Sequence, residues 1–399
     1  MKLVLLPMFK KLLISLIFFA SGFLFWHNIS IYNPKNGFDG SGHMHYINYI
    51  LTNNRLPQSH EGWELNQPPV YYLLAAPLQS IGIKPQVINV LSFFIIALLF
   101  YRLTRSYLSI LAFASLPMAS YLVPLVTNEY LSGLLGIILL LILLRLSTSQ
   151  EKDRHLKILL YVTFVLAFFT KVTALMFIPL IPLALFLKKD KKWVSRSVIL
   201  VAMCIALVSP MMINNFVRYG KPLVINDDFV EFTSEKDKRD LAFFFSPMWI
   251  FRLDLYDAHS YSFIGGFWNT LWHDGEHVTT PVVEFHKKPF ALWLLGFPLL
   301  AISTYGLFKF FKKNRKQGIV LVAYLTLALI VLVLYNFRLP YNNVLKTFFV
   351  FPVVVPYVLG IVEAGKSGKL TCVTPLLLIV QYLIMYSWFY IQPWWYVAQ

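Results

Sequence analysis

The residues of this 399-residue chain best suited to chemistry are carboxylates and lysines that lie beside long apolar runs. Asp39 and Glu64 fall in the polar stretch after the first such run, and Glu129 lies between two later runs. Lys171 is enclosed by apolar sequence, and Lys346 borders another run. Charged groups at a membrane margin are costly to desolvate, so their presence there indicates a function. A carboxylate can accept a proton from a hydroxyl, and a lysine is a compact partner for a phosphate.

The composition is that of a membrane protein. The chain is 58% hydrophobic and 14% charged, with a mean hydropathy of +0.63, whereas soluble domains carry about 25% charged residues. We predict an all-α polytopic protein, a single integral membrane domain over residues 1–399, with about eleven spans. Several of the predicted spans are short. Two of them are joined by Lys171 alone, and this pair could be either two thin spans or one re-entrant hairpin. We favour two spans. The spans are Leu12–Ile31, Val87–Tyr101, Tyr107–Val126, Tyr130–Leu144, Leu156–Thr170, Val172–Leu187, Val198–Met212, Phe290–Phe308, Ile319–Tyr335, Phe348–Val362 and Leu370–Tyr390.

The net charge of +16 is explained by membrane topology. With the N-terminus inside, connections rich in Lys and Arg, such as Arg145–Lys157 and Lys188–Arg196, fall on the cytoplasmic side, and most acidic residues fall outside. This is the positive-inside rule, so no nucleic-acid partner is needed to explain the basic excess. We predict a bacterial cytoplasmic membrane, or the ER membrane in a eukaryote, with the acidic segments facing outward. No small-residue cleavage site follows the first run, which favours an uncleaved anchor over a signal peptide.

Two of the predicted extracytoplasmic segments are long, residues 32–86 and residues 214–288. In the first, apolar residues after Asp39 follow helical spacing, which predicts an amphipathic helix lying on the membrane surface. Asp39 and His43 are four residues apart and therefore share one face of that helix. Pro68-Pro69 predicts the start of a second short helix. The outer face is thus predicted to be a partly helical cap over the bundle.

Five short motifs follow one another along the chain, and together they resemble one enzyme family. They are Phe38-Asp39-Gly40, Glu64-Leu65-Asn66-Gln67-Pro68-Pro69-Val70-Tyr71-Tyr72, Thr127-Asn128-Glu129, Thr170-Lys171-Val172-Thr173-Ala174 and Lys346-Thr347-Phe348-Phe349-Val350-Phe351-Pro352. The series is similar to the bacterial relatives of protein O-mannosyltransferases and of the lipid A aminoarabinose transferase, from Leu12 to about Gly360. These are polytopic glycosyltransferases of the GT-C fold that use polyprenyl-phosphate sugars. The family usually has Asp at the position of Glu129.

The resemblance implies a GT-C-like bundle that transfers a sugar, with inversion, from a polyprenyl-phosphate donor to an acceptor outside the cytoplasm. The acceptor would be a lipid, a glycan or a protein. Asp39 would take the proton of the acceptor hydroxyl, and Glu64 and Glu129 are further candidate catalytic acids. The basic residues would approach the phosphate of the donor. The candidate substrate-binding residues are His43, Tyr71, Lys171, Arg338 and Lys346.

Two metal sites are considered from the sequence. Some relatives bind a divalent metal ion near the acids of the first loop, which makes Asp39, His43 and Glu64 candidate ligands here. The run His273-Asp274-Gly275-Glu276-His277 also fits the inverted zinc-peptidase signature. Its central glycine weakens a helix and no third ligand follows in a helical context, so a polar turn is the preferred interpretation.

Each candidate residue also has a structural explanation. Asp39 and Glu129 could cap helices, Glu64 could be solvated in a loop, and the lysines could reach lipid headgroups. The alternative functions are a transporter or flippase and a non-enzymatic subunit of envelope polysaccharide assembly. A transporter predicts titratable groups at mid-span and paired half-chain repeats, whereas the acids here gather at one face. The glycosyltransferase hypothesis predicts that Asp39, Lys171 and Lys346 converge on one cavity at the outer margin of the membrane.

Overall fold

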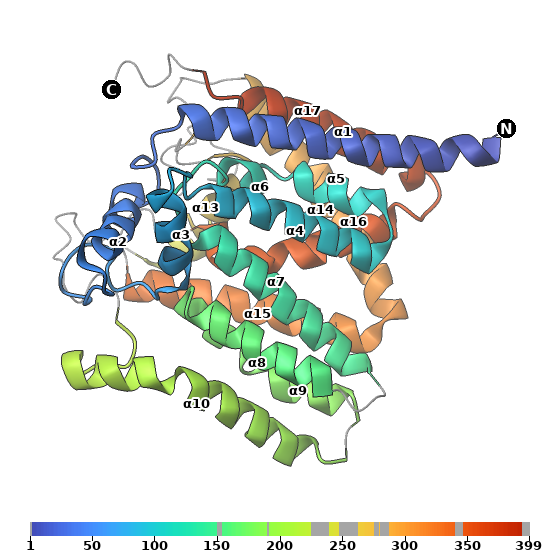
Figure 1. Cartoon of the computed structure of the whole chain (residues 1–399). Helices are drawn as coiled ribbons and strands as arrows, with labels where there is room; N and C mark the ends of the chain where they lie inside the picture. The colour runs from blue at the N-terminus through green and yellow to red at the C-terminus, as the bar shows by residue number, and fades with distance from the viewer. Residues whose placement is uncertain are drawn as a thin grey trace.

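The computed structural model of the chain describes residues 2–149, 154–189, 191–224, 239–246, 262–274, 279, 287–339 and 346–392, with side chains from residue 11 onward. All regular structure in these residues is helical, which confirms the all-α prediction. The N-terminus lies at one end of the helix bundle, and α2 and α3 lie at the other (Figure 1). The helices are α1 (Lys2–Ile31), α2 (Gly40–Asn53), α3 (Val70–Ser80), α4 (Val87–Thr104), α5 (Tyr107–Ala114), α6 (Pro117–Tyr121), α7 (Glu129–Thr148), α8 (Arg154–Phe168), η1 (Val172–Phe177), α9 (Leu180–Leu187), α10 (Trp193–Tyr219), α11 (Leu241–Phe245), α13 (Phe263–Trp272), α14 (Lys287–Lys313), α15 (Arg315–Arg338), η4 (Thr347–Val353), α16 (Val354–Ala364) and α17 (Leu370–Trp388).

Eight helical stretches within the described residues are long and apolar enough to cross a membrane, as expected for a polytopic membrane protein. Eight of the predicted spans coincide with them, whereas the full count of about eleven is not confirmed. The stretches are Lys11–Ile31, Val87–Thr104, Glu129–Thr148, Trp193–Tyr219, Lys287–Lys313, Arg315–Arg338, Thr347–Ala364 and Leu370–Trp388.

The other three predicted spans form shorter pieces. The run Tyr107–Val126 is divided into α5 and α6, because Pro117 lacks the backbone N–H needed to continue the first helix. Before Lys171, helix α8 has 15 residues. After Lys171, the short 3₁₀ turn η1 is followed by α9, which has 8 residues. At 1.5 Å per residue, none of these helices alone reaches the roughly 30 Å thickness of a hydrocarbon core.

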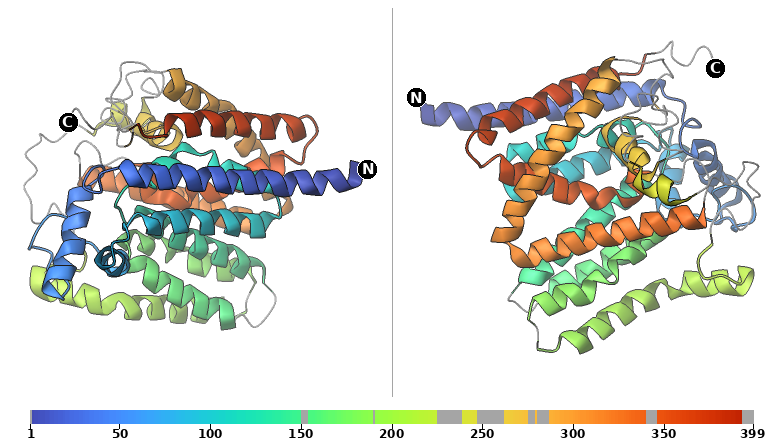
Figure 2. Two further views of the ribbon diagram at one scale, coloured as in Figure 1. Left: turned by 45° about the horizontal axis from the view of Figure 1, so that its top comes forward. Right: turned by 180° about the vertical axis from the view of Figure 1, so that it is seen from behind.

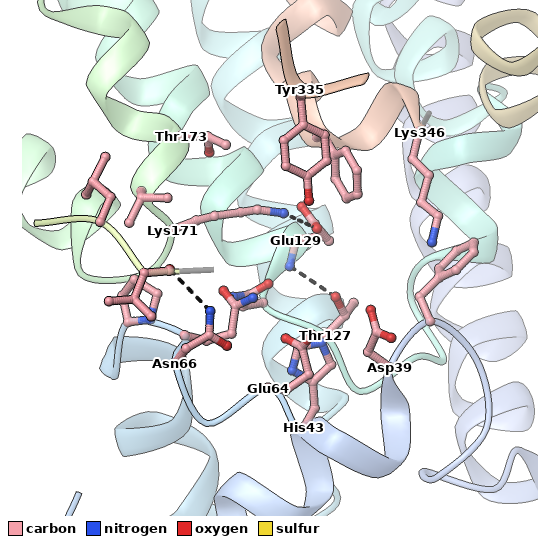
Figure 3. A pocket seen from close by; sticks show the side chains of 18 of the residues that line it. Asp39, His43, Glu64, Asn66, Thr127, Glu129, Lys171, Thr173, Tyr335 and Lys346 are labelled. Carbon is pink, nitrogen blue, oxygen red and sulfur yellow. Dashed lines mark hydrogen bonds and ion pairs between the residues drawn. The ribbon is translucent and has the colours of Figure 1, made fainter. Parts of the chain in front are cut away.

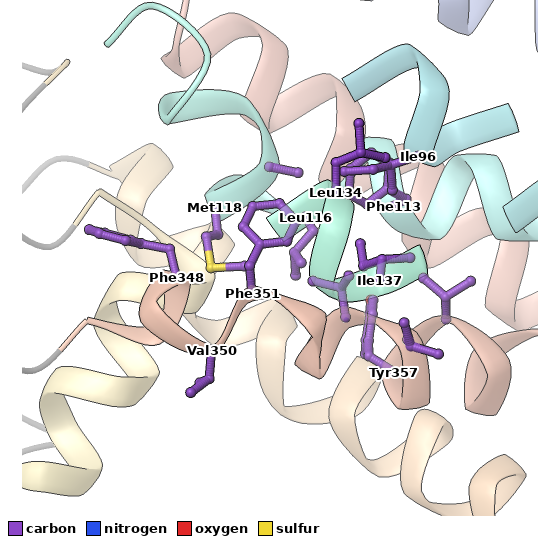
Figure 4. Close-up of a cluster of buried hydrophobic side chains, with 14 of the residues drawn as sticks. Ile96, Phe113, Leu116, Met118, Leu134, Ile137, Phe348, Val350, Phe351 and Tyr357 are labelled. Carbon is purple, nitrogen blue, oxygen red and sulfur yellow. The ribbon is translucent and has the colours of Figure 1, made fainter. Parts of the chain in front are cut away.

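Helix α7 lies at the centre of the bundle and contacts α4, α8, α9, α15 and η4. Two glycines allow η4 to approach it closely, since a Cβ atom on Gly133 would lie 2.6 Å from Phe351 Cγ and one on Gly136 would lie 2.7 Å from Pro352 Cγ. Phe351 is buried beside Leu116, Met118 and Ile137 in the apolar core (Figure 4). This packing holds the start of η4, where Lys346 is the N-cap, beside the start of α7, where Glu129 is the first residue.

The first long loop, residues 32–86, contains the two short helices α2 and α3, and we call this segment the cap. Its helix α2 confirms the predicted amphipathic helix, and Pro69 is the N-cap of α3. The two helices bury a small core that includes Met44, Ile47, Tyr46, Tyr71 and Tyr72. An ion pair of 2.7 Å between Arg55 and Glu61 closes the loop that follows α2. Most of the second predicted outer segment, residues 214–288, lies outside the described residues.

Helix α10 lies at the edge of the bundle, where it packs on α8 and α9 (Figures 1 and 2). Near its end it is joined to the cap, since Ser59 N donates a hydrogen bond of 3.1 Å to the Tyr219 hydroxyl. Farther along, Asn66 Nδ2 donates a hydrogen bond of 3.3 Å to the Val224 carbonyl. At another edge of the bundle, α1 lies beside α17, where the Ser21 and Tyr382 hydroxyls are 2.9 Å apart. The cap is therefore joined to the end of α10 and to the residues that follow it.

Candidate active site

A cavity of about 260 Å³ lies where the cap meets the membrane helices. Asp39, Lys171 and Lys346 all line it, so the predicted convergence of these residues is observed. Glu64 and Glu129 also line it, as does His43 (Figure 3). Residues from four distant parts of the sequence thus meet in one place.

The two sides of the cavity differ in chemistry. The cap contributes the carboxylates Asp39 and Glu64 together with His43, and in Figure 3 these side chains point into the cavity from the same side. The bundle contributes the lysines and many apolar side chains. The bundle residues of apolar or aromatic character are Val172, Met211, Val331, Leu332, Tyr335, Leu339, Phe348 and Phe349, and Leu223 and Val224 follow α10.

Both cap carboxylates are held by left-handed backbone. Asp39 has φ 54° and Glu64 has φ 63°, whereas the other non-glycine residues with positive φ (Asn54, Arg105 and Lys189) follow the ends of helices. A left-handed conformation costs roughly 1 kcal/mol in a residue with a Cβ atom and persists only where the surroundings impose it. Asp tolerates this region and Glu does so less readily. The fold therefore fixes these two side chains at the cavity at some cost in stability.

Glu129 and Lys171 form a largely buried ion pair at the cavity wall. Their side chains are 9% and 13% exposed, respectively. Lys171 lies in extended backbone immediately before η1, and its Nζ is also 4.4 Å from the centre of the Phe349 ring. The neighbouring Asn128 binds the carbonyl of Thr170 through its Nδ2, at 3.2 Å. This second contact holds the start of α7 against the corner that carries Lys171.

Lys346 lies among aromatic rings. It is only 6% exposed, and its Nζ is 3.9 Å from the centre of the Phe38 ring. The Phe38 ring also lies 4.9 Å from that of Phe348. Cation–π contacts of this kind stabilise an ammonium group by about 0.5–2 kcal/mol. Lys346 thus brings a positive charge to the wall of the cavity, where it attracts anions.

His43 is a neutral, buried hydrogen-bonding group. Its Nδ1 is 2.7 Å from the Tyr72 hydroxyl, and the Tyr72 ring stacks on that of Tyr46 at 3.7 Å. Burial lowers the pKa of His43 from 6.5 to about 4; Asp39 opposes this shift and Lys171 adds to it. At neutral pH His43 can orient a ligand through a hydrogen bond, and it is poorly suited to be a base.

His43 is expected to make the protein less stable as the pH falls from 6.5 toward 4. Above pH 6.5 the imidazole is neutral in both the folded and the unfolded chain. Within the interval the unfolded chain binds a proton that the folded chain does not, which lowers the free energy of unfolding by up to about 3 kcal/mol. The free energy of unfolding in detergent should fall less steeply in His43→Gln. Equal slopes for the two proteins would contradict a buried, neutral His43.

Gly42 allows the cap loop to approach α2, a feature that the sequence did not reveal. A Cβ atom at this position would lie 2.7 Å from Trp63 Cδ1 and 2.8 Å from Glu64 Cγ. The absence of a side chain at position 42 therefore lets both residues pack against α2. Trp63 is half-buried and lines the cavity, although no motif pointed to it.

The substitution Gly42→Ala is expected to displace Trp63 and Glu64 and to lower the free energy of unfolding by about 1–3 kcal/mol, as overpacking does elsewhere. Thermal unfolding in detergent measures this change. Ser41→Ala is the matched control, because Ser41 precedes Gly42 in α2 and is exposed; surface changes of this kind alter stability by less than about 0.5 kcal/mol. A Gly42→Ala protein as stable as the control would show that the loop moves freely away from α2.

Two predicted substrate-binding residues lie away from the cavity. Tyr71 is fully buried in the cap core, with its ring 6.5 Å from that of His43, and it does not line the cavity. Arg338 is exposed in the last turn of α15 and does not line it either. Tyr335, one turn earlier, does.

The metal hypotheses receive no support from the described residues. In this part of the chain no three His, Cys, Asp or Glu side chains form a group that could hold a metal ion, so Asp39, His43 and Glu64 share a cavity without making such a site. Of the second candidate run, residues 275–277 lie outside the described residues. Asp274 is buried there and accepts a hydrogen bond of 2.7 Å from Thr279 N.

The cavity thus places potential proton acceptors opposite two lysines, within reach of apolar helices. Such an arrangement suits a reaction in which a hydroxyl loses a proton while an anion leaves. In comparisons with known proteins, no family model, no curated protein and no solved structure matches the chain.

Proposed function

We propose that this protein is a membrane glycosyltransferase that moves a sugar from a polyprenyl-phosphate donor to a hydroxyl acceptor on the outer side of the membrane. The observation that carries the proposal is the meeting of Asp39, Glu64, Lys171 and Lys346 at one cavity between the cap and the membrane helices. The five sequence motifs that resemble polyprenyl-phosphate-dependent enzymes give the same expectation.

The proposed reaction is a single displacement at the anomeric carbon of the sugar. Asp39 accepts the proton of the acceptor hydroxyl while its oxygen forms a bond to the anomeric carbon. The bond from that carbon to the phosphate oxygen breaks, and its electron pair leaves with the polyprenyl phosphate. Lys346 and Lys171 stabilise the charge on the departing phosphate. Glu64 supports the same site as a second carboxylate.

Glu129 has a different role in this proposal. The sequence made it a candidate catalytic acid, but its ion pair with Lys171 favours a role as counter-ion. A buried lysine without a partner would be costly in the empty site. Glu129 thus offsets the cost of burying Lys171 at the place where the phosphate would bind.

The cavity also suits a donor with a long apolar tail. Its wall on the bundle side includes Met211 of α10 and Val331 and Leu332 of α15. Both helices carry exposed apolar side chains, such as Phe216 and Leu334, as helices in contact with lipid do. We infer that the tail lies along these helices, the phosphate near the lysines and the sugar toward the cap.

The test is turnover by the purified protein in lipid nanodiscs with a panel of radiolabelled polyprenyl-phosphate sugars and with envelope extract as acceptor. We expect label to move from one donor to an acceptor fraction, with release of polyprenyl phosphate. Failure to bind or consume any member of the panel would reject the proposal. Movement of an intact donor between leaflets without loss of the sugar would favour the flippase alternative.

A further inference from the structure

Among the residues on the cap side of the cavity, Trp63 and Asn66 take no part in the proposed reaction. Both line the cavity. Asn66 appears in Figure 3 on the same side as Glu64 and His43, with Lys346 on the far side. If Lys346 holds the phosphate, the cap side of the cavity, which both residues line, is left for the sugar of the donor.

The orientation of the Asn66 amide is fixed by its partner. Its Nδ2 donates a hydrogen bond of 3.3 Å to the carbonyl of Val224, which can only accept. The amide oxygen must therefore point the other way. That oxygen, Oδ1, is buried and has no hydrogen-bond partner among the described residues. Buried acceptors are normally satisfied, so this oxygen indicates a missing donor such as a ligand hydroxyl.

Trp63 gives the same side of the cavity a rigid aromatic surface. Its indole is held against α2 because Gly42 has no side chain. The ring is half-buried, which leaves part of it at the cavity. Aromatic side chains with a few well-placed polar groups are typical of sites for small ligands. An indole face suits the C–H face of a sugar ring, whose hydroxyls then point sideways to polar partners.

We propose that Trp63 and Asn66 recognise the sugar ring of the donor. Trp63 packs against an apolar face of the ring, and Asn66 Oδ1 accepts a hydrogen bond from a ring hydroxyl. This assignment rests on the proposed function, and it adds the residues that determine which sugar is accepted. The phosphate and the polyprenyl tail do not contact this pair.

The experiment compares two ligands, a polyprenyl-phosphate sugar and bare polyprenyl phosphate, for binding to the protein in nanodiscs. Asn66→Ala and Trp63→Leu are expected to weaken binding of the sugar-bearing ligand by about tenfold each, as the loss of one net contact does. Binding of the bare lipid phosphate should change less than about twofold, which also shows that the variants are folded. Asn53→Ala and Trp26→Leu are the matched controls, since Asn53 is exposed and Trp26 is 75% exposed.

Deoxy analogues of the donor sugar identify the bonded hydroxyl. In wild type, one deoxy analogue should bind about tenfold more weakly than the parent sugar. In Asn66→Ala, the same analogue and the parent sugar should bind equally well, because the side chain that distinguishes them is absent. If both ligands weaken equally in the variants, the pair is merely structural and the inference is wrong. If wild type binds the bare lipid phosphate and the sugar-bearing ligand equally well, sugar recognition at this site is also wrong. If wild type binds neither, the proposed function itself fails.

Discussion

Replacing Asp39 by Asn is expected to lower the rate of sugar transfer by about 10²–10⁴-fold, the usual contribution of a general base, while donor affinity stays close to that of wild type. Asn has the shape of Asp but cannot accept the proton of the acceptor hydroxyl. It also tolerates left-handed backbone, so the φ of 54° at this position need not change. The loss should therefore be in the chemical step, and single-turnover rates with saturating donor measure it.

A comparison with Glu64 decides whether Asp39 is the general base. Glu64 lines the same cavity and also has left-handed backbone, so Glu64→Gln is a matched variant with the same change of charge. We expect it to transfer sugar faster than Asp39→Asn. If Glu64→Gln loses the rate and Asp39→Asn keeps it, Glu64 is the base and Asp39 is not. Ser41→Ala, exposed on α2, controls for changes to this helix.

Local pattern was enough to predict the parts of the site that depend on one helix or one turn. The apolar spacing after Asp39 predicted α2, and the separation of four residues put His43 on the same face. Lys171 was singled out because it interrupts apolar sequence, and it does occupy the corner between α8 and η1. The meeting of these residues with Lys346 came from the resemblance, since nothing local relates η4 to the cap.

Contacts between distant segments could not be predicted. Gly42 is inconspicuous in the sequence, and its importance is apparent only when Trp63 and Glu64 are found against α2. The bond from Asn66 to Val224 joins the cap to the residues after α10, 158 positions away. Such contacts depend on how whole helices pack, which short motifs do not specify.

The motifs did not show which of their residues would line the cavity. Tyr71 and Tyr72 are adjacent on α3, so their side chains leave the helix about 100° apart. Both are nevertheless fully buried in the cap core, where Tyr72 bonds to His43, and neither lines the cavity. On α15, Arg338 follows Tyr335 by three residues and lies near the same face. It is in the last turn of the helix, where its side chain is exposed and does not line the cavity. A motif gives the order of residues but not the rotation of the helix that carries them.

The largest expected effect on stability concerns the Glu129–Lys171 pair. Lys171→Gln leaves a buried carboxylate without its partner, and Glu129→Gln leaves a buried ammonium group. We expect each single change to lower the free energy of unfolding by about 3–5 kcal/mol, as breaking a buried ion pair does. The double variant should regain most of that loss, because two neutral amides remain and can bond to each other.

A surface pair is the matched control. Lys366 and Glu363 lie 2.7 Å apart, but the Lys366 side chain is 55% exposed, so Lys366→Gln should cost less than about 1 kcal/mol. The measurement is the free energy of unfolding in detergent for wild type, the two single variants and the double variant. Additive losses at positions 129 and 171 would show that the two side chains stabilise the fold independently.

The same double variant separates folding from catalysis. Its stability is expected to recover while sugar transfer remains low, because no cation at position 171 faces the phosphate that leaves. Its affinity for bare polyprenyl phosphate should also be lower than that of wild type, since one of the two lysines at the cavity is absent. If the double variant regains both stability and wild-type turnover, the ion pair serves only the fold. Lys346 would then be the one lysine left to receive the phosphate within the described part of the cavity wall.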